Sequence, residues 1–330
     1  MEVNRRESIA SVPGKIILFG EHFVVYGNPA ILMAVDLRLD VFVKVIQNSN
    51  KIYIRSDDKK NVADLINFEL KNGKLSFFDP IMFTCKMIFK QRMIQDMGLD
   101  IKIKSAIPNG IGLGSSGAVS VATTAAISSL FKKTNKKNVY IDAMETEKLI
   151  HKYSSGADCL ISTVGGLVYY IKDQKYKKIN YKDNLSFLII DTGIKHSTKK
   201  MVQKVKRFSE KENMQFLQIK KVAYDICNEA MKKIQKSDEV EIGRLMKENH
   251  KLLKQIGVTN KAIERIIKIS DKAGVFGSKL TGAGGGGSVI SLVPSDEKKR
   301  IERIIKKQGY DVFPVRIDNN GLVFKKIDSL

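Results

Sequence analysis

Short apolar runs separated by turns occupy the first part of the chain. The segments at 15–20, 30–35, 39–46 and 51–56 are rich in apolar residues, with alternation clearest in VFVKV within 39–46. Alternation with a period of two is typical of a strand that is buried on one face. A further alternating run, LDIKIKSAI at 99–107, leads straight into a glycine-rich loop. The pattern therefore predicts a sheet in the N-terminal part of the chain.

Apolar residues at helical spacing follow these strands and continue through the second half of the chain. The spacing predicts helices at 81–98, 118–131, 141–152, 198–236, 240–256 and 261–274. The helix at 118–131, AVSVATTAAISSLF, contains only small and apolar residues, so we expect it to be buried. A shorter helix follows the polar turn at 153–158 and is closed by Gly165 and Gly166.

The second half of the chain has its own strand pattern. The segments 167–171 and 186–193 have the composition of strands, the second of them buried. From 288 onward the order is strand, helix, strand, a β-α-β unit of the kind that covers one face of a sheet. The polar, turn-rich stretch at 175–185 is the predicted boundary, which gives an N-terminal domain of residues 1–183 and a C-terminal domain of residues 184–330.

The high content of lysine is the feature of the composition that bears on the partners of the protein. The 330 residues include 57 Lys and Arg against 35 Asp and Glu, a formal net charge of +22. A surplus of this size points to anionic partners. The lysines are scattered, however, and no basic stripe interleaved with aromatic residues is present. We favour a solvated, lysine-rich surface, with a nucleic-acid-binding protein as an alternative class.

The cysteines and the N-terminal residues indicate the cellular compartment in which the protein is expected. Cys85, Cys159 and Cys227 cannot all pair and lack the spacing of a metal site, which indicates a reducing cytoplasm. Pro13 and Lys15 interrupt any apolar region of a signal peptide, and no apolar run is long enough to span a bilayer. The sequence therefore predicts a cytoplasmic protein with no membrane and no nucleic acid partner.

A glycine-rich loop, PNGIGLGSSGAVSVA at 108–122, is the first candidate for chemistry. Gly112, Gly114 and Gly117 satisfy G-x-G-x-x-G, with a strand before them and a helix after. No second strand follows where a nicotinamide site needs one, so an oxidoreductase that binds a dinucleotide is an alternative and not our preference. Glycines let backbone N–H groups approach an anion, and the helix that starts near Ser116 points its positive end at it. We expect this loop to hold phosphate.

A second glycine cluster lies in KLTGAGGGGSVISLV at 279–293. Five of the six residues between 282 and 287 are glycine. Because glycine loses more backbone entropy on folding than any other residue, we interpret the cluster as backbone that must come close to a ligand and not as a packing feature.

The third candidate is PGKIILFGEHFVVYG at 13–27. Lys15 opens an apolar strand, so its ammonium group is placed to lie at the edge of a cleft. Glu21 and His22 follow a Phe-Gly turn at the other end of that strand.

Together these three segments resemble the motifs of the GHMP kinases, in the same order and over nearly the whole chain. The segment at 13–27, with MKENHKLLKQIGV at 246–258 and SSGADCLISTVGG at 154–166, is most similar to the branch that phosphorylates mevalonate. The resemblance implies an α+β fold, with a ribosomal S5 domain 2-like N-terminal domain and a ferredoxin-like C-terminal domain. It also implies ATP and mevalonate as substrates, Mg²⁺ as cofactor and a homodimer. A kinase that acts on phosphomevalonate or on another mevalonate hydroxyl is the alternative within the family.

The same resemblance assigns roles to individual residues. Asp158 would accept the proton of the substrate hydroxyl, and Lys15 would pair with it. Ser116 and Glu147 would hold Mg²⁺, while Glu21, His22 and Thr198 are expected beside the substrate. The residues expected to bind ATP are Pro108, Gly110, Gly112, Leu113, Gly114, Ser115, Ser116, Gly117, Gly284 and Gly285.

Overall fold

Two sheets, each covered by helices, make up the part of the chain that the structure describes. The computed structural model describes residues 6–56, 59–64, 76, 78–131, 133–150, 156–174, 176–182, 184–195 and 197–328, apart from the side chains of 59–64, 149, 150 and 328. Residues 153–155 of the predicted polar turn lie outside these ranges. Among the described residues, no helix is long and apolar enough to cross a lipid bilayer.

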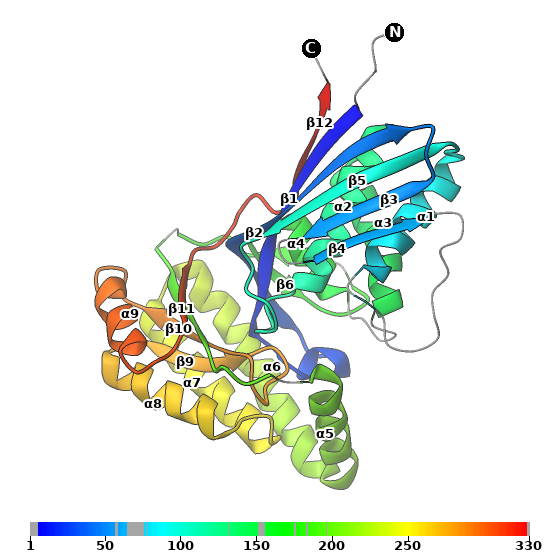
Figure 1. The fold of residues 1–330 in the computed structure, drawn as a ribbon. Coiled ribbons are helices and arrows are strands. Elements are labelled where there is room, and N and C mark those ends of the chain that lie inside the picture. Colours follow the sequence, from blue (N-terminus) through cyan, green and yellow to red (C-terminus); the bar gives the residue numbers. More distant parts are fainter. Residues whose placement is uncertain are drawn as a thin grey trace.

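The first sheet is almost entirely antiparallel. Its strands are β1 (Arg6–Phe19), β2 (Ala30–Gln47), β3 (Lys51–Ser56), β4 (Lys59–Asp64), β5 (Met97–Ser105), β6 (Leu167–Tyr170), β7 (Lys177–Lys178) and β12 (Val323–Asp328). The main path runs β12-β1-β2-β5-β3-β4, and β6 pairs with β2 and β7. Only the β3–β5 pair is parallel among these pairs. The last strand therefore returns from the second half of the chain to lie beside β1, at the top of Figure 1.

Helices cover one face of this sheet (Figure 1). They are α1 (Asp79–Arg92), α2 (Ser115–Phe131), α3 (Lys136–Ile150) and α4 (Ala157–Val164), and the short 3₁₀ helix η1 (Phe23–Tyr26) follows β1. Helix α2 contacts β1 and β2 on one side and the other three α-helices around it. The small, apolar helix predicted at 118–131 is thus confirmed as buried, and the structure starts it at Ser115.

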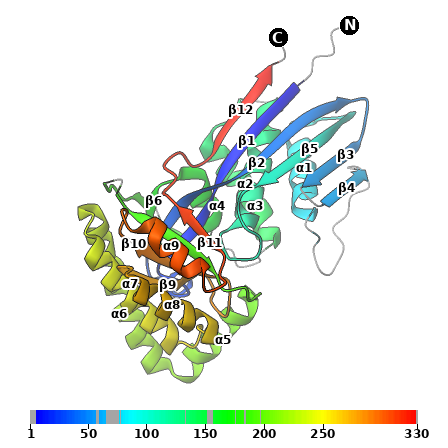
Figure 2. The same ribbon diagram turned by 60° about the vertical axis from the view of Figure 1, so that its left-hand side comes forward.

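The second sheet has four antiparallel strands, in the order β11-β8-β10-β9. They are β8 (Ser186–Asp191), β9 (Gly277–Thr281), β10 (Ser288–Val293) and β11 (Val312–Val315). The helices are α5 (Thr198–Lys211), α6 (Asn213–Lys236), α7 (Glu239–Gln255), α8 (Lys261–Ala273) and α9 (Lys298–Lys306). The predicted β-α-β unit is β10-α9-β11, whose two strands flank β8 (Figure 2). This is the split arrangement of a ferredoxin-like domain.

The structure corrects several predicted boundaries. The helix predicted at 81–98 ends at Arg92, because Met93 adopts the left-handed conformation with φ of 51°. Residues 97 and 98 already belong to β5. The helix predicted at 198–236 is two helices, broken at Glu212, whose φ of −113° and ψ of 51° are not helical.

The predicted division at 183/184 falls between β7 and β8, although β12 lies in the first sheet. Polar contacts join the two parts of the molecule. Thr281 Oγ1 donates to the Ile17 carbonyl at 2.9 Å, and Ser288 Oγ donates to the Ile111 carbonyl. Both donors come from the segment that carries the second glycine cluster, so this segment is fixed against the first part of the chain.

Candidate active site

Lys15 and Asp158 meet at the centre of the candidate site. Lys15 lies on β1 and Asp158 in the first turn of α4, and the distance from Nζ to Oδ1 is 3.1 Å. The Lys15 side chain is 7% exposed, whereas that of Asp158 is 28% exposed. The ammonium group is therefore fixed inside the protein, and the carboxylate is accessible to a ligand. The structure brings together the two residues for which the sequence predicted a catalytic pair.

The first glycine loop wraps around the stem of Lys15. The backbone N–H of Lys15 donates to the Leu113 carbonyl at 2.9 Å. A Cβ atom on Gly114, whose φ is +72°, would lie only 3.0 Å from Lys15 Cγ. Helix α2 begins directly afterwards, so Ser115 and Ser116 occupy its first turn. The free N–H groups and positive dipole end of α2 therefore lie beside the Lys15–Asp158 pair, an arrangement that favours an anion.

Gly117 explains how closely α2 approaches α4. A Cβ atom at this position would lie 2.9 Å from Asp158 Cβ and 3.3 Å from its carbonyl carbon. Real Cβ atoms do not come this close to backbone or short side chains, so the contact needs glycine. The helix that begins at the glycine loop and the helix that carries Asp158 thus meet at their N-terminal ends.

Glu147 on α3 is buried near this pair, with the residue only 2% exposed. Burial, together with the nearby charge of Asp158, raises the pKa of Glu147 from 4.5 to about 7, although the charge of Lys15 opposes the rise. A divalent cation bound to Glu147 would stabilise the ionised form of this buried carboxylate. The predicted donors, the Ser116 hydroxyl and the Glu147 carboxylate, are the hard oxygen ligands that Mg²⁺ prefers.

The donor set also limits what kind of metal site is present. Among the described residues, no group of three or more His, Cys, Asp and Glu side chains is placed to hold a metal ion. Mg²⁺ usually keeps several waters and binds through one or two carboxylates together with substrate phosphates. The residues present therefore fit a magnesium ion that arrives with a nucleotide.

The second glycine cluster corrects part of the sequence interpretation. A Cβ atom on Gly284 would lie 2.2 Å from the Val258 carbonyl, and one on Gly285 would lie 2.6 Å from Met201 Sδ. Close packing against backbone thus explains the need for glycine at 284, whereas at 285 the Cβ atom would meet only a flexible side chain. Contact of Gly284 and Gly285 with ATP stays a prediction. Gly282 is different: the nearest atom to its Cβ position would be the Gly112 carbonyl, 3.9 Å away. The two glycine loops therefore lie next to each other at the contact between the two parts of the molecule.

The three residues expected beside the substrate have different surroundings. Glu21 is fully buried and forms an ion pair with Lys279, a residue that the sequence did not single out. His22 Nε2 hydrogen-bonds the Ala283 carbonyl at 2.9 Å, and burial lowers the pKa of this imidazole. Thr198 is exposed at the start of α5. Glu21 and His22 thus lie at the contact between the two parts, and their direct contact with substrate stays a prediction.

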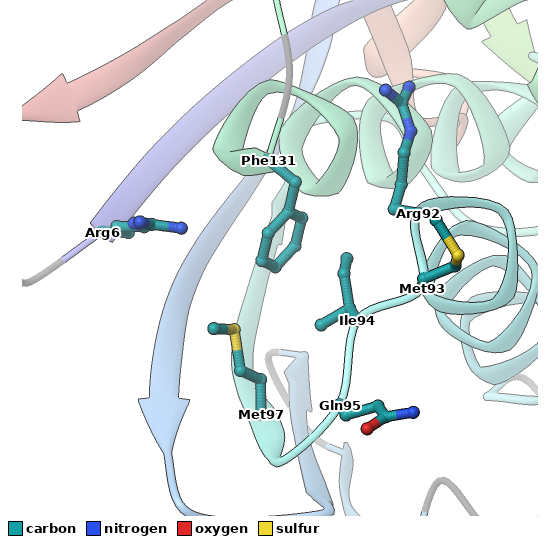
Figure 3. Close-up of a pocket in the computed structure, with 7 residues that line it drawn as sticks. All are labelled: Arg6, Arg92, Met93, Ile94, Gln95, Met97 and Phe131. Carbon is teal, nitrogen blue, oxygen red and sulfur yellow. The ribbon is translucent and has the colours of Figure 1, made fainter.

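A separate hollow lies at the C-terminal end of α2, and Figure 3 shows the residues that line it. Its volume is about 540 Å³, and its lining comes from Arg6, Arg92, Met93, Ile94, Gln95, Met97 and Phe131. Phe131 ends α2, whereas Ser115 begins it, so the hollow and the Lys15–Asp158 pair lie about 25 Å apart along this helix. The guanidinium groups of Arg6 and Arg92 lie on different sides of the hollow and do not converge.

Comparisons with known proteins agree with this arrangement. The model of the GHMP kinases N terminal domain matches residues 81–166, and that of the GHMP kinases C terminal matches 230–311. The chain is 34% identical to the mevalonate kinase of Pyrococcus horikoshii, over 97% of this chain and 98% of the relative.

Solved structures show the same likeness. The crystal structure of the Methanococcus jannaschii mevalonate kinase has a TM-score of 0.82 at 32% identity, covering 94% of this chain and 98% of that one. The L. major mevalonate kinase in complex with R-mevalonate has a TM-score of 0.81 at 25% identity, covering 94% and 96%. The α+β fold predicted from the sequence is confirmed by this likeness. The chain therefore belongs to the GHMP kinase family.

Proposed function

We propose that this ATP-dependent GHMP kinase phosphorylates the 5-hydroxyl of (R)-mevalonate and produces 5-phosphomevalonate for isoprenoid biosynthesis. The observation that carries the proposal is the Lys15–Asp158 pair, 3.1 Å apart, beside the N-terminus of α2. The choice of mevalonate is supported by the relatives named mevalonate kinase and by the similar L. major enzyme in complex with R-mevalonate.

The reaction needs a positioned hydroxyl and neutralised phosphates. Asp158 accepts the proton of the substrate hydroxyl, because its carboxylate is the exposed member of the pair. Lys15 stays beside the same oxygen and stabilises the negative charge that develops during transfer. The backbone from Gly112 to Ser116 binds the ATP phosphates through N–H groups at the start of α2.

Ser116 and Glu147 would hold Mg²⁺, and the ion supplies positive charge that offsets the charge of the phosphates. Ionisation of Glu147 is required for that role. Burial works against this ionisation, so the proposed metal site also depends on the Lys15 ammonium, which favours the charged carboxylate. The predicted homodimer and the cytoplasmic location stay predictions.

A coupled assay of ADP release over mevalonate, phosphomevalonate, homoserine and galactose tests the proposal. We expect turnover with mevalonate and a product phosphorylated at the 5-hydroxyl by ³¹P and ¹³C NMR. Turnover of phosphomevalonate without turnover of mevalonate would overturn the substrate assignment. Thermal unfolding gives a second check: ATP with Mg²⁺ raises the Tm and NAD does not, whereas protection by NAD alone would support the oxidoreductase alternative.

A further inference from the structure

A fully buried ion pair crosses the contact between the two parts of the molecule. Glu21 follows β1 in the first part, Lys279 lies on β9 in the second, and both side chains are 0% exposed. Lys279 Nζ contacts Glu21 Oε1 and also donates to the Leu280 carbonyl at 2.9 Å. The other carboxylate oxygen, Glu21 Oε2, is buried without a hydrogen-bond partner among the described residues.

Stability does not explain such a pair. Removing two charges from water costs more than an incompletely hydrogen-bonded contact returns, and apolar replacements are often neutral or stabilising. Burial accordingly raises the pKa of Glu21 and lowers that of Lys279, while the attraction between them opposes both changes. A buried pair with one oxygen unsatisfied therefore calls for a reason other than stability.

The turn that contains Glu21 supplies that reason, because it is strained. The Phe23 N–H donates to the Glu21 carbonyl at 2.7 Å, and His22 between them has φ of 62° and ψ of −44°. These angles define a γ-turn with positive φ, a rare conformation for a residue with a side chain. Such strain persists only where surrounding contacts hold it, and it clusters at functional sites.

Contacts with the second part of the chain hold this turn on two sides. His22 Nε2 hydrogen-bonds the Ala283 carbonyl within the second glycine cluster, and Lys279 binds Glu21. Strand β9 is itself fixed: the Leu280 N–H donates to His250 Nδ1 at 3.4 Å. The Lys279 ammonium therefore projects from an anchored strand and not from a mobile loop.

Glu21 also connects Lys279 to the catalytic pair. Lys15 lies on β1 and Glu21 comes two residues after the end of this strand at Phe19, so the turn and Lys15 belong to one continuous segment. The charge of Lys15 is also the smallest of the effects that lower the pKa of Glu21. Lys15 in turn binds Asp158. Positive and negative side chains thus alternate in the series Lys279, Glu21, Lys15 and Asp158. This series of charges leads from the second sheet to the reaction site.

We propose that Lys279 is a positioning residue for phosphoryl transfer: it binds Glu21 across the contact, holds the strained turn against the second glycine cluster, and thereby sets Lys15 beside Asp158. This inference rests on the function proposed above. It assigns to a strand lysine the task of assembling the site from the two parts of the chain, with no contact between Lys279 and substrate.

The test compares kcat, KM and Tm for the wild type, Lys279→Met, and the double variant Lys279→Met with Glu21→Met. The single variant leaves the carboxylate buried without its cation, so we expect the Tm to fall by about 10 °C. The double variant replaces the pair with apolar chains of similar length and should recover most of that loss. Its kcat should nevertheless stay about 100-fold below the wild type, with little change in the KM for ATP or in the KM for the alcohol. A loss of turnover that comes with a large rise in the KM for the alcohol would contradict the positioning role, because Glu21 itself would then contact the substrate.

Ser278→Ala is the matched control. Ser278 lies on β9, one residue from Lys279 and on the opposite face of the strand. Its hydroxyl forms a buried hydrogen bond at 2.7 Å with the Ser291 hydroxyl on β10. This variant should lower the Tm and leave kcat at the wild-type value. A double variant whose kcat returns to the wild-type value together with its Tm would overturn the proposal, because the pair would then be merely structural.

Hydrogen exchange of the Phe23 amide gives a readout that needs no turnover. We expect exchange at least 10-fold faster in the double variant than in the wild type, measured well below both Tm values, because the turn is no longer held. Exchange at the wild-type rate would contradict the positioning role. The alcohol panel with the wild type tests the proposed function separately, and the variant ratios are measured with whichever alcohol the wild type phosphorylates.

Discussion

Replacing Glu147 with glutamine should change how stability depends on pH. The pKa of this buried carboxyl is raised from 4.5 to about 7. The difference of 2.5 units, at about 1.36 kcal/mol per unit, gives roughly 3 kcal/mol. Because the folded protein binds the proton more tightly than the unfolded chain, the stabilisation is fully present below pH 4.5 and is lost as the pH rises through 7.

Glutamine mimics the protonated carboxyl at every pH. In the presence of a chelator, we expect Glu147→Gln to match the wild type near pH 4.5 and to be more stable at pH 8. The expected advantage of up to about 3 kcal/mol corresponds to a Tm higher by about 5–10 °C. Differential scanning calorimetry from pH 4.5 to 8.5 measures it. The variant should also lose turnover, because it lacks the charge proposed to hold Mg²⁺.

Glu145→Gln is the control for this experiment. Glu145 lies on the same helix but is 52% exposed and forms a surface ion pair with Lys148, so the Tm of this variant should stay close to that of the wild type. Equal Tm differences at pH 4.5 and pH 8 for Glu147→Gln, or no difference at pH 8, would refute the reasoning from burial.

Two further variants test other parts of the site. Lys15→Met removes the ammonium group 3.1 Å from Asp158, so it should lower kcat by about 10²–10⁴-fold and leave the affinity for ATP unchanged. Steady-state kinetics and nucleotide titration measure the two quantities, and a kcat within threefold of the wild type would contradict this role. Gly284→Ala places a Cβ atom 2.2 Å from the Val258 carbonyl, so it should displace the loop and lower the Tm by more than Gly309→Ala, which has a similar positive φ and open space. Equal losses of Tm in these two variants would show that only backbone strain matters.

Local patterns predicted the elements whose burial is decided by nearby residues. The alternation in 39–46 and 99–107 correctly predicted parts of β2 and β5, and the small apolar residues of 118–131 predicted the buried helix α2. The helix at 81–98 was predicted too long because its apolar spacing continues past the point where Met93 turns left-handed. A backbone change at one ordinary residue leaves no mark on the hydrophobic pattern.

Elements that depend on distant partners were not predicted. Strand β12 pairs with β1, so that Arg6 lies opposite Asp328, and nothing within 323–328 signals this partner. Pairing over such a separation is decided by the assembled fold and not by local propensity. Strand β9 was missed for a different reason: it pairs with the next strand, β10, but it is only five residues long and is followed directly by the glycines of 282–287.

The residues of the site likewise fall into those that local motifs identified and those whose role depends on distant partners. Motifs led directly to Lys15 and Asp158, which the structure places in contact. Lys279 was missed because a lysine within a strand is usually solvated, and its burial depends on Glu21, 258 residues earlier. The position of Lys279 between Ser278 and Leu280, directly before the glycines of 282–287, was the one signal that the sequence offered. The cluster at 282–287 was interpreted as ligand contact, whereas Gly284 and Gly285 pack against protein.

The turnover of Asp158→Asn tests the central claim most directly. The substitution keeps the size of the side chain beside Lys15 and removes its capacity to accept a proton. We predict that kcat with mevalonate falls by about 10²–10⁴-fold while the affinity for ATP with Mg²⁺, measured by calorimetry, stays close to that of the wild type. Near-normal turnover by a folded variant would contradict the assignment of Asp158 as the base and, with it, the proposed mechanism.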